Sequence, residues 1–161
     1  MNAGVIFCLS YRTALQELSL RRCAERFGFS LVDFRAAASR EELPQTLGAM
    51  LSRCDTVFLS GSCTGPRPDF CPDVFRLLSI PLTLSGEPDH VLRLEGRRKH
   101  GYLIESRTQA IVLLPDLPEE SDAMLPLALD HLQQKFSLTD RGAKHEESRL
   151  DQLVQNSMKK N

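Results

Sequence analysis

The sequence contains no tryptophan and only two tyrosines, and aromatic residues make up 6% of its 161 residues. No hydrophobic run reaches the ~20 apolar residues that a membrane-spanning helix needs. Neither sign of charge dominates, because 20 lysines and arginines balance 21 acidic residues and leave a net charge of −1. We therefore expect no membrane partner, and we see no overall electrostatic basis for binding nucleic acid.

We also expect no secretion signal, since Ser10-Tyr11-Arg12 interrupts the first apolar segment early and this segment has no basic leader. Cysteine occurs at five positions, an odd number, and forms no CxxC pair. This pattern favours buried reduced thiols over a disulfide framework or a zinc site. We therefore expect a cytoplasmic protein.

What the sequence does contain is an alternation of two patterns along its first half. Short apolar runs predict strands at 5–9, 29–34 and 55–60, and periodic apolar positions predict helices at 13–28 and 39–53. This order implies right-handed crossovers and a largely parallel sheet. A chain of this length is the size of one ordinary domain.

Helix ends carry their own signals. Gly28 can supply the left-handed turn that ends the first helix, and Ser39 is the expected cap of the second. In the second half, a short helix is predicted at 73–79. Strands are predicted at 90–94, 101–105 and 110–114, and the four residues between the last two indicate an antiparallel hairpin.

The final helix is expected from Glu119 to Phe136, and Pro126 should bend it or delay its start. The remaining residues are highly charged and poor in large apolar side chains. We therefore predict one α/β domain over 1–138 and a helical or disordered C-terminal tail over 139–161.

A loop rich in glycine and proline, residues 61–69, directly follows the third predicted strand. Ligands of open α/β sheets bind outside the carboxyl ends of the strands, so this loop is the strongest candidate site. Gly61 and Gly65 let a ligand approach the backbone, and Ser62 and Thr64 can donate hydrogen bonds to phosphate oxygens. The alternative is that these residues only turn the chain.

Charged and rigid residues complete the loop. Arg67 offers a planar guanidinium to a phosphate, and Asp69 can hold Mg²⁺ through its carboxylate. Pro66 and Pro68 restrict the loop, which lowers the ordering cost of binding. Cys63 could act as a nucleophile if a helix end or Arg67 favoured its thiolate, and a structural thiol is the alternative.

Two segments resemble motifs of the molybdopterin-binding domain superfamily. Residues 55–69 are similar to its strand and loop motif S-D-x-V-hydrophobic-T-G-G-x-G-P-T-x-D-D, and residues 101–120 to its strand pair and L-P-G-x-P-x-E-M turn. Over residues 3–136 the chain resembles the N-terminal domain of the competence/damage-inducible protein A (CinA) family. The resemblance implies a three-layer α/β/α sandwich with a mostly parallel mixed sheet.

The resemblance also implies a function and a site. It implies binding of molybdopterin or a nucleotide phosphate, related to molybdenum-cofactor biosynthesis, with the anion held by the loop from Gly61 to Arg67. Pro115, Pro118 and Glu119 would form the opposite wall, and Asp69 would be the catalytic residue and the Mg²⁺ ligand.

Two other functions are compatible with the resemblance. One is a Mg²⁺-dependent ADP-ribose pyrophosphatase or nucleotidyltransferase, and the other is a degenerate, non-catalytic scaffold domain. The expected partners are a small phosphorylated ligand, except in the scaffold alternative, whose pocket would no longer be used, and further copies of the chain in a homo-oligomer.

Several positions depart from the superfamily pattern. Its Gly-Gly pair is replaced here by Gly61-Ser62 with Cys63 inserted, its second aspartate by Phe70, and the glycine of its turn by Asp116. Phenylalanine removes a carboxylate that could reach a metal, and aspartate places a negative charge where phosphate would approach. We therefore expect an altered pocket that binds rather than catalyses.

Other polar groups have structural explanations. The histidines have no ligand spacing, which favours surface or capping roles over a metal site. The basic segment 93–100 could bind phosphate or RNA or form a solvated hairpin tip. Asp116, Glu119 and Glu120 lie at the start of the final helix, where carboxylates favour the helix dipole.

Overall fold

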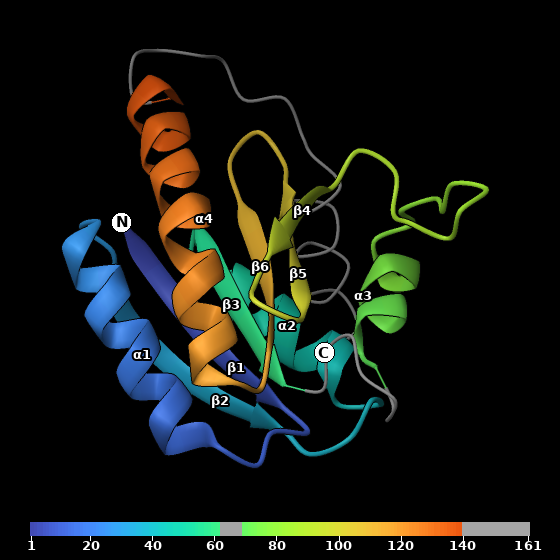
Figure 1. Cartoon of the computed structure of the whole chain (residues 1–161), viewed down its shortest axis with the longest axis horizontal. Coiled ribbons are helices and arrows are strands. Elements are labelled where there is room, and N and C mark those ends of the chain that lie inside the picture. Colours follow the sequence, from blue (N-terminus) through green and yellow to red (C-terminus); the bar gives the residue numbers. More distant parts are fainter. Residues whose placement is uncertain (62–68, 140–161) are drawn as a thin grey trace.

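The computed structural model describes residues 1–61 and 69–139, which form one six-stranded sheet and four helices (Figure 1). The elements, in chain order, are β1 (Asn2–Cys8), α1 (Thr13–Arg26), β2 (Ser30–Ala37), α2 (Leu43–Leu51), β3 (Thr56–Gly61), α3 (Cys71–Leu77), β4 (Leu92–Glu95), β5 (His100–Glu105), β6 (Ala110–Pro115) and α4 (Pro118–Thr139). Every strand and helix expected from the sequence is present, with shifted ends.

The sheet has the strand order β2-β1-β3-β6-β5-β4. Neighbours among β2, β1, β3 and β6 pair in parallel, whereas β5 pairs antiparallel with both β6 and β4. The predicted largely parallel sheet and the predicted β5–β6 hairpin are therefore confirmed. The register aligns Cys8 with Gly61 and Gly61 with Pro115, so β1, β3 and β6 end together at one edge.

The helices cover both faces of this sheet, which confirms the three-layer α/β/α sandwich (Figure 1). Helices α1 and α4 pack on one face, where Phe58 of β3 joins a cluster of buried side chains with Leu20 and Leu125. Helices α2 and α3 pack on the other face against Leu59 and its neighbours. All six residues of β3 are buried, as expected for a central strand covered on both sides.

Two helix ends show how local signals worked. Gly28 has a φ of +74°, which confirms the predicted left-handed turn after α1. Helix α2 begins at Leu43, and Ser39 instead accepts the Glu42 N–H within the preceding turn at 3.4 Å. Pro44, which lies in the first turn of α2, needs no N–H partner there. The serine therefore caps a turn and not the helix.

Helix α4 starts at Pro118 and contains Pro126 without a delayed start. Proline has no N–H, so the carbonyl of Asp122 loses its usual helical partner, a cost reduced by the exposure of Pro126. No helix in the described part of the chain is long and apolar enough to cross a membrane. The predicted tail lies, from residue 140 on, outside the described residues, and the proposed domain boundary stays a prediction.

Candidate functional site

The candidate site lies where the chain leaves β1 and β3 in opposite directions. Strand β1 leads to α1 on one face of the sheet, and β3 is followed by α3 on the other face. Connections that diverge from neighbouring parallel strands open a crevice at the carboxyl edge, the usual place for a ligand in such sheets. The sequence prediction of a site after β3 thus falls at the topological switch point.

Gly61 is sterically required at this point. A Cβ built at Gly61 would lie 1.7 Å from the backbone oxygen of Cys8, which is its partner in the adjacent strand. Only glycine lets the ends of β1 and β3 approach so closely. The Cys8 thiol beside it is buried, and burial, followed by the charge of Asp73, raises its pKa to about 11. Cys8 is therefore a neutral thiol and no nucleophile.

The structure describes only the two ends of the predicted loop. Its predicted site residues Ser62, Thr64, Gly65, Pro66 and Arg67 lie outside the described residues, as do Cys63 and Pro68. The two ends of the loop, Gly61 and Asp69, are described. Gly61 lies at the carboxyl end of β3, and the roles of the residues between Gly61 and Asp69 stay predictions.

Asp69 closes a tight turn just before α3. Its Oδ1 accepts the N–H of Cys71 at 2.9 Å, and its backbone oxygen accepts a hydrogen bond from Nη2 of Arg40 at 3.3 Å. Phe70, which replaces an expected carboxylate, is fully buried in the core between the sheet and the α2–α3 layer. One carboxylate oxygen of Asp69 is therefore already used by the protein itself.

The described residues do not provide a magnesium site around Asp69. Within the described ranges 1–61 and 69–139, no group of three or more acidic, histidine or cysteine side chains is placed to hold a metal ion. Magnesium prefers several oxygen ligands in near-octahedral geometry. Since the described donors do not fit the ion, we derive no chemistry through Mg²⁺.

Asp116, in the turn after β6, reaches across the carboxyl edge to the end of β1. Its Oδ1 accepts the hydroxyl of Ser10 at 2.5 Å, and its Oδ2 accepts the N–H of Tyr11 at 2.7 Å. From the sequence, Asp116 was expected to repel phosphate, but neither donor was expected, because both lie on another loop more than a hundred residues away. Asp116 joins the loops that follow β1 and β6.

A buried polar cluster supports the same turn from inside the α1–α4 layer. Nε2 of Gln16 donates to the backbone oxygen of Pro115 at 3.3 Å and to Oγ of Ser121 at 2.5 Å. The Ser121 hydroxyl also donates to the Pro115 oxygen, at 3.4 Å. Among the described residues, Oε1 of Gln16 and Oγ of Ser60 are buried without a hydrogen-bond partner. The hydrogen bonds from Gln16 and Ser121 thus hold the end of β6 in place.

The predicted opposite wall of the pocket is only partly assembled. Pro115 is buried at the end of β6, Pro118 is half-buried at the first position of α4, and Glu119 is exposed. Glu120, its neighbour, is instead 3% exposed and points toward the β4–β5 turn. The first turn of α4 thus directs one carboxylate to solvent and one into the protein.

The carboxylate of Glu120 accepts hydrogen bonds from the backbone of the predicted basic tip. Its Oε2 accepts the N–H groups of Arg97 at 2.7 Å and of Arg98 and Lys99 at 3.1 Å. Burial alone would raise the pKa of Glu120. The three hydrogen bonds together have the larger, opposite effect, so the pKa of Glu120 lies below its ordinary value. The backbone N–H groups of the tip are therefore satisfied internally and do not form an open phosphate site.

Four polar side chains form a hydrogen-bonded chain where β5 begins. The hydroxyl of Tyr102 donates to Oε2 of Glu87 at 3.1 Å, and Nη1 of Arg93 contacts Oε1 of Glu87 at 3.1 Å. His100 Nε2 lies 3.0 Å from the Tyr102 oxygen, and because that hydroxyl donates to a carboxylate, Nε2 must carry the proton. Burial is the main cause that lowers the pKa of His100, and the charge of Arg93 is the second. Nearby carboxylates, which include Asp69, raise this pKa but do not cancel the decrease.

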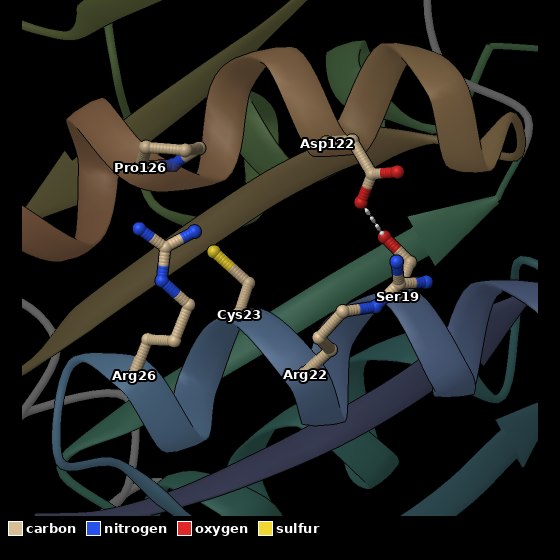
Figure 2. Close-up of a pocket in the computed structure, with 6 residues that line it drawn as sticks. All are labelled: Ser19, Arg22, Cys23, Arg26, Asp122 and Pro126. Atoms are coloured by element: carbon tan, nitrogen blue, oxygen red, sulfur yellow. Dashed lines mark hydrogen bonds between the residues drawn. The ribbon is translucent and has the colours of Figure 1, made fainter.

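A separate pocket of about 170 Å³ lies between α1 and α4 (Figure 2). It is lined by Ser19, Arg22, Cys23, Arg26, Asp122 and Pro126, and the Ser19 hydroxyl donates to the Asp122 carboxylate across it. Burial raises the pKa of the Cys23 thiol, which is therefore neutral. The pocket follows the helices and not the ends of the strands, so we do not include it in the candidate site.

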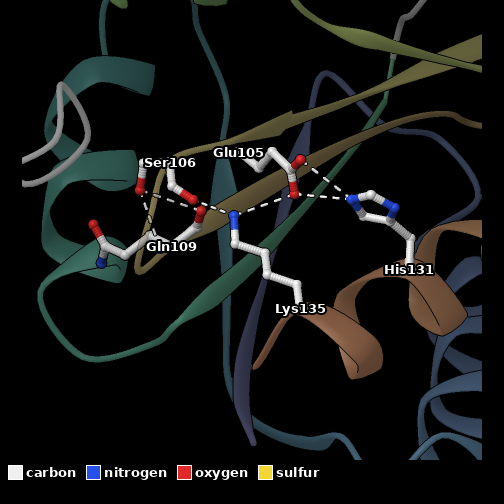
Figure 3. Close-up of polar contacts among 5 residues, drawn as sticks. All are labelled: Glu105, Ser106, Gln109, His131 and Lys135. Carbon is white, nitrogen blue, oxygen red and sulfur yellow. Dashed lines mark hydrogen bonds and ion pairs between the residues drawn. The ribbon is translucent and has the colours of Figure 1, made fainter. Parts of the chain in front are cut away.

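Polar contacts at the opposite edge of the sheet are structural (Figure 3). Lys135 of α4 binds both Glu105 and the backbone oxygen of Ser106, and His131 contacts Glu105 at 3.0 Å. In the hairpin turn Nε2 of Gln109 donates to the backbone oxygen of Leu51 at 2.6 Å. These contacts hold the β5–β6 turn against α4 and the end of α2.

This arrangement of sheet and helices occurs in solved structures. CinA from Thermoplasma acidophilum, described as a protein of unknown function, matches 82% of this chain and 99% of its own with 15% identity and a TM-score of 0.68. The molybdopterin biosynthesis enzyme MoaB from Thermus thermophilus matches 89% and 99%, with 17% identity and a TM-score of 0.56. MogA matches 86% and 99%, with 20% identity and a TM-score of 0.60.

This chain has the fold of CinA, MoaB and MogA. The fold that the resemblance in the sequence implied is therefore confirmed. No family model matches the sequence, and no curated protein matches it. At identities of 20% or less the likeness concerns the fold, and the ligand of this chain has to be argued from its own residues.

Proposed function

We propose that this chain binds a small phosphorylated ligand, molybdopterin or a nucleotide, in the crevice between the carboxyl ends of β1 and β3. The observation that carries the proposal is the contact between Gly61 and Cys8, which brings two diverging parallel strands together with no side chain between them. A ligand placed there can reach backbone N–H groups directly.

The phosphate would be held by the loop that follows Gly61. Ser62, Thr64 and the backbone N–H groups around Gly65 are the proposed donors, and Arg67 the proposed counter-charge. Pro66 would limit the freedom of the loop before binding. Pro115, Pro118 and Glu119 would face the rest of the ligand from the β6 side.

The ligand class is supported by the proteins that share the fold. One of them, MoaB, is described as a molybdopterin biosynthesis enzyme, and MogA has the same architecture. Binding is favoured over catalysis because Asp69 already accepts the Cys71 N–H and Phe70 belongs to the core. A pyrophosphatase or nucleotidyltransferase has no metal-binding group among the described residues to support it.

Calorimetry tests the proposal with the full chain. We expect stoichiometric uptake of molybdopterin, or of an adenine or guanine nucleotide, in titrations with and without Mg²⁺. Thr64→Ala and Arg67→Ala should each weaken binding about tenfold, as expected for the loss of a hydrogen bond to a charged group. Arg53→Ala is a matched control, because the exposed Arg53 follows α2 at the other edge of the sheet.

A single result would overturn the proposal. If the chain takes up none of these ligands under either condition, the crevice is not a binding site for them and the scaffold interpretation gains support.

We also propose that the protein is a cytoplasmic homo-oligomer, and light scattering of the full chain tests its assembly.

A further inference from the structure

Two arginines of α1, Arg22 and Arg26, border the pocket between α1 and α4. They lie one helical turn apart, and both guanidinium groups are directed toward α4 (Figure 2). Within the part of the chain that the structure describes, neither side chain makes a hydrogen bond or an ion pair. The pocket therefore contains two positive charges whose N–H donors are available.

A neighbouring arginine on the same helix shows the contrast. Nε of Arg21 donates to Glu17 at 2.8 Å, and its guanidinium carbon lies 4.4 Å from the centroid of the Phe34 ring. The negative end of the helix dipole explains a cation in the last turn of α1, where Arg26 lies. Among the described contacts, nothing of either kind accounts for Arg22.

The remaining residues of the pocket leave its charge positive. Ser19 and Cys23 line it from α1, and Asp122 and Pro126 line it from α4. The Ser19 hydroxyl donates to the Asp122 carboxylate, which offsets part of the repulsion that this carboxylate would exert on an anion. Because two arginines outweigh one aspartate, the pocket carries a net positive charge.

The volume of the pocket limits the kind of anion. Its volume of about 170 Å³ lies below the ~300–1,000 Å³ of sites that enclose drug-sized molecules. It can hold an oxyanion or the charged end of a larger molecule, but not a complete nucleotide. Two planar guanidinium groups offer more donors than the two oxygens of one carboxylate need, whereas a phosphate group supplies at least three acceptor oxygens.

We propose that the pocket between α1 and α4 binds the phosphate group of a small molecule, with Arg22 and Arg26 as the donors. This site is separate from the crevice at the ends of β1 and β3, because all its lining residues lie within two helices. The inference does not depend on the proposed function, since none of these residues belongs to the loop after β3.

Inorganic phosphate is the probe, and the full chain is titrated at constant ionic strength. In two-dimensional ¹⁵N spectra we expect phosphate to shift the amide signals of Ser19, Cys23 and Asp122 together, along one binding curve. Acetate, which supplies two oxygens and one charge, should shift the same signals less. Absence of the shifts with phosphate would overturn the proposal, and larger shifts with acetate would overturn the assignment to phosphate.

The two arginines are tested by substitution. Arg22→Ala and Arg26→Ala should each weaken phosphate binding about tenfold, as expected for the loss of a hydrogen bond between charged groups. Arg21→Ala is the matched control, because it removes the same charge from the same helix at a position that does not line the pocket. It should change the affinity little. Equal weakening by Arg21→Ala and Arg22→Ala would show attraction to the charge of the helix alone and would overturn the site.

Two loop variants separate this site from the crevice. Thr64→Ala and Arg67→Ala should leave the shifts of the Ser19 and Asp122 amides unchanged, and a loss of these shifts in either folded variant would overturn the pocket as the site. Shifts of these amides by phosphate, with no nucleotide uptake in calorimetry, would support the pocket and overturn the proposed function alone. Nucleotide uptake without the shifts would overturn the pocket alone.

Discussion

Gly96 leaves the space that Glu120 fills: a Cβ built at Gly96 would lie 2.2 Å from Oε2 of Glu120. The same Oε2 accepts three backbone N–H groups of the β4–β5 turn. A glycine and a glutamate that are distant in the sequence therefore define one structural lock between this turn and α4.

The first prediction concerns this lock. Glu120→Gln should lower the free energy of unfolding by about 2 kcal/mol, because the amide replaces a charged acceptor and places an N–H₂ group against N–H donors. Gly96→Ala should destabilise the protein by a similar amount through the close contact. Urea unfolding at pH 7 measures both. Glu119→Gln, on the exposed side of the same turn, is the matched control and should change stability little.

The second prediction is a pH dependence of the same contact. The pKa of Glu120 is lower in the folded protein than its ordinary value of 4.5, so the unfolded chain binds its proton more readily. The stability that the ionised group provides is present above pH 4.5 and is lost as the pH falls through the folded pKa. The stability difference between the unmodified chain and Glu120→Gln should therefore shrink below that pH. A difference that stays constant down to pH 3 would contradict the role of the charge.

The third prediction concerns the chain of hydrogen bonds at β5. Tyr102→Phe removes the hydroxyl between Glu87 and His100 and should cost about 1 kcal/mol of stability, measured by urea unfolding. In the unmodified chain, long-range ¹⁵N spectra should find the His100 proton on Nε2. Tyr11→Phe is a suitable control, since the Tyr11 side chain is 86% exposed. A proton on Nδ1 alone would show that the Tyr102 hydroxyl does not donate to Glu87.

The fourth prediction separates two glycines. Gly61→Ala should cost more than about 3 kcal/mol or prevent folding, because the new Cβ would collide with the Cys8 backbone. Gly28→Ala meets no neighbouring atom, and only its φ of +74° opposes the substitution, so about 1 kcal/mol should be lost. Thermal unfolding compares the two. Similar losses in both variants would contradict the steric role of Gly61.

The fold was largely predictable because its signals are local. Buried runs such as the one that became β3, the switch to helical periodicity and the hairpin spacing before Ala110 each depend on neighbouring residues. The cap at Ser39 was misplaced because Pro44 and the preceding turn moved the start of α2 by several residues.

The candidate site was predictable only in its position. Gly61 was expected to let a ligand approach the backbone; the structure shows a close approach of the Cys8 backbone there, and the ligand stays a prediction. The partners of Asp116 and of Glu120 could not be predicted, because Ser10 and the N–H groups near Arg97 are brought to them by the sheet order. In the sequence both carboxylates had the same explanation, a favourable position near a helix start.

The turn before α4 and the first turn of α4 therefore hold two loops at once, one through Asp116 and one through Glu120. The first loop follows β1 and contains Ser10, and the second lies between β4 and β5 and contains Arg97. A small rotation of this helix end would be transmitted to both loops together. We therefore expect the amide signals of the β4–β5 turn to respond to changes at Ser10, and two-dimensional ¹⁵N spectra of the full chain measure this.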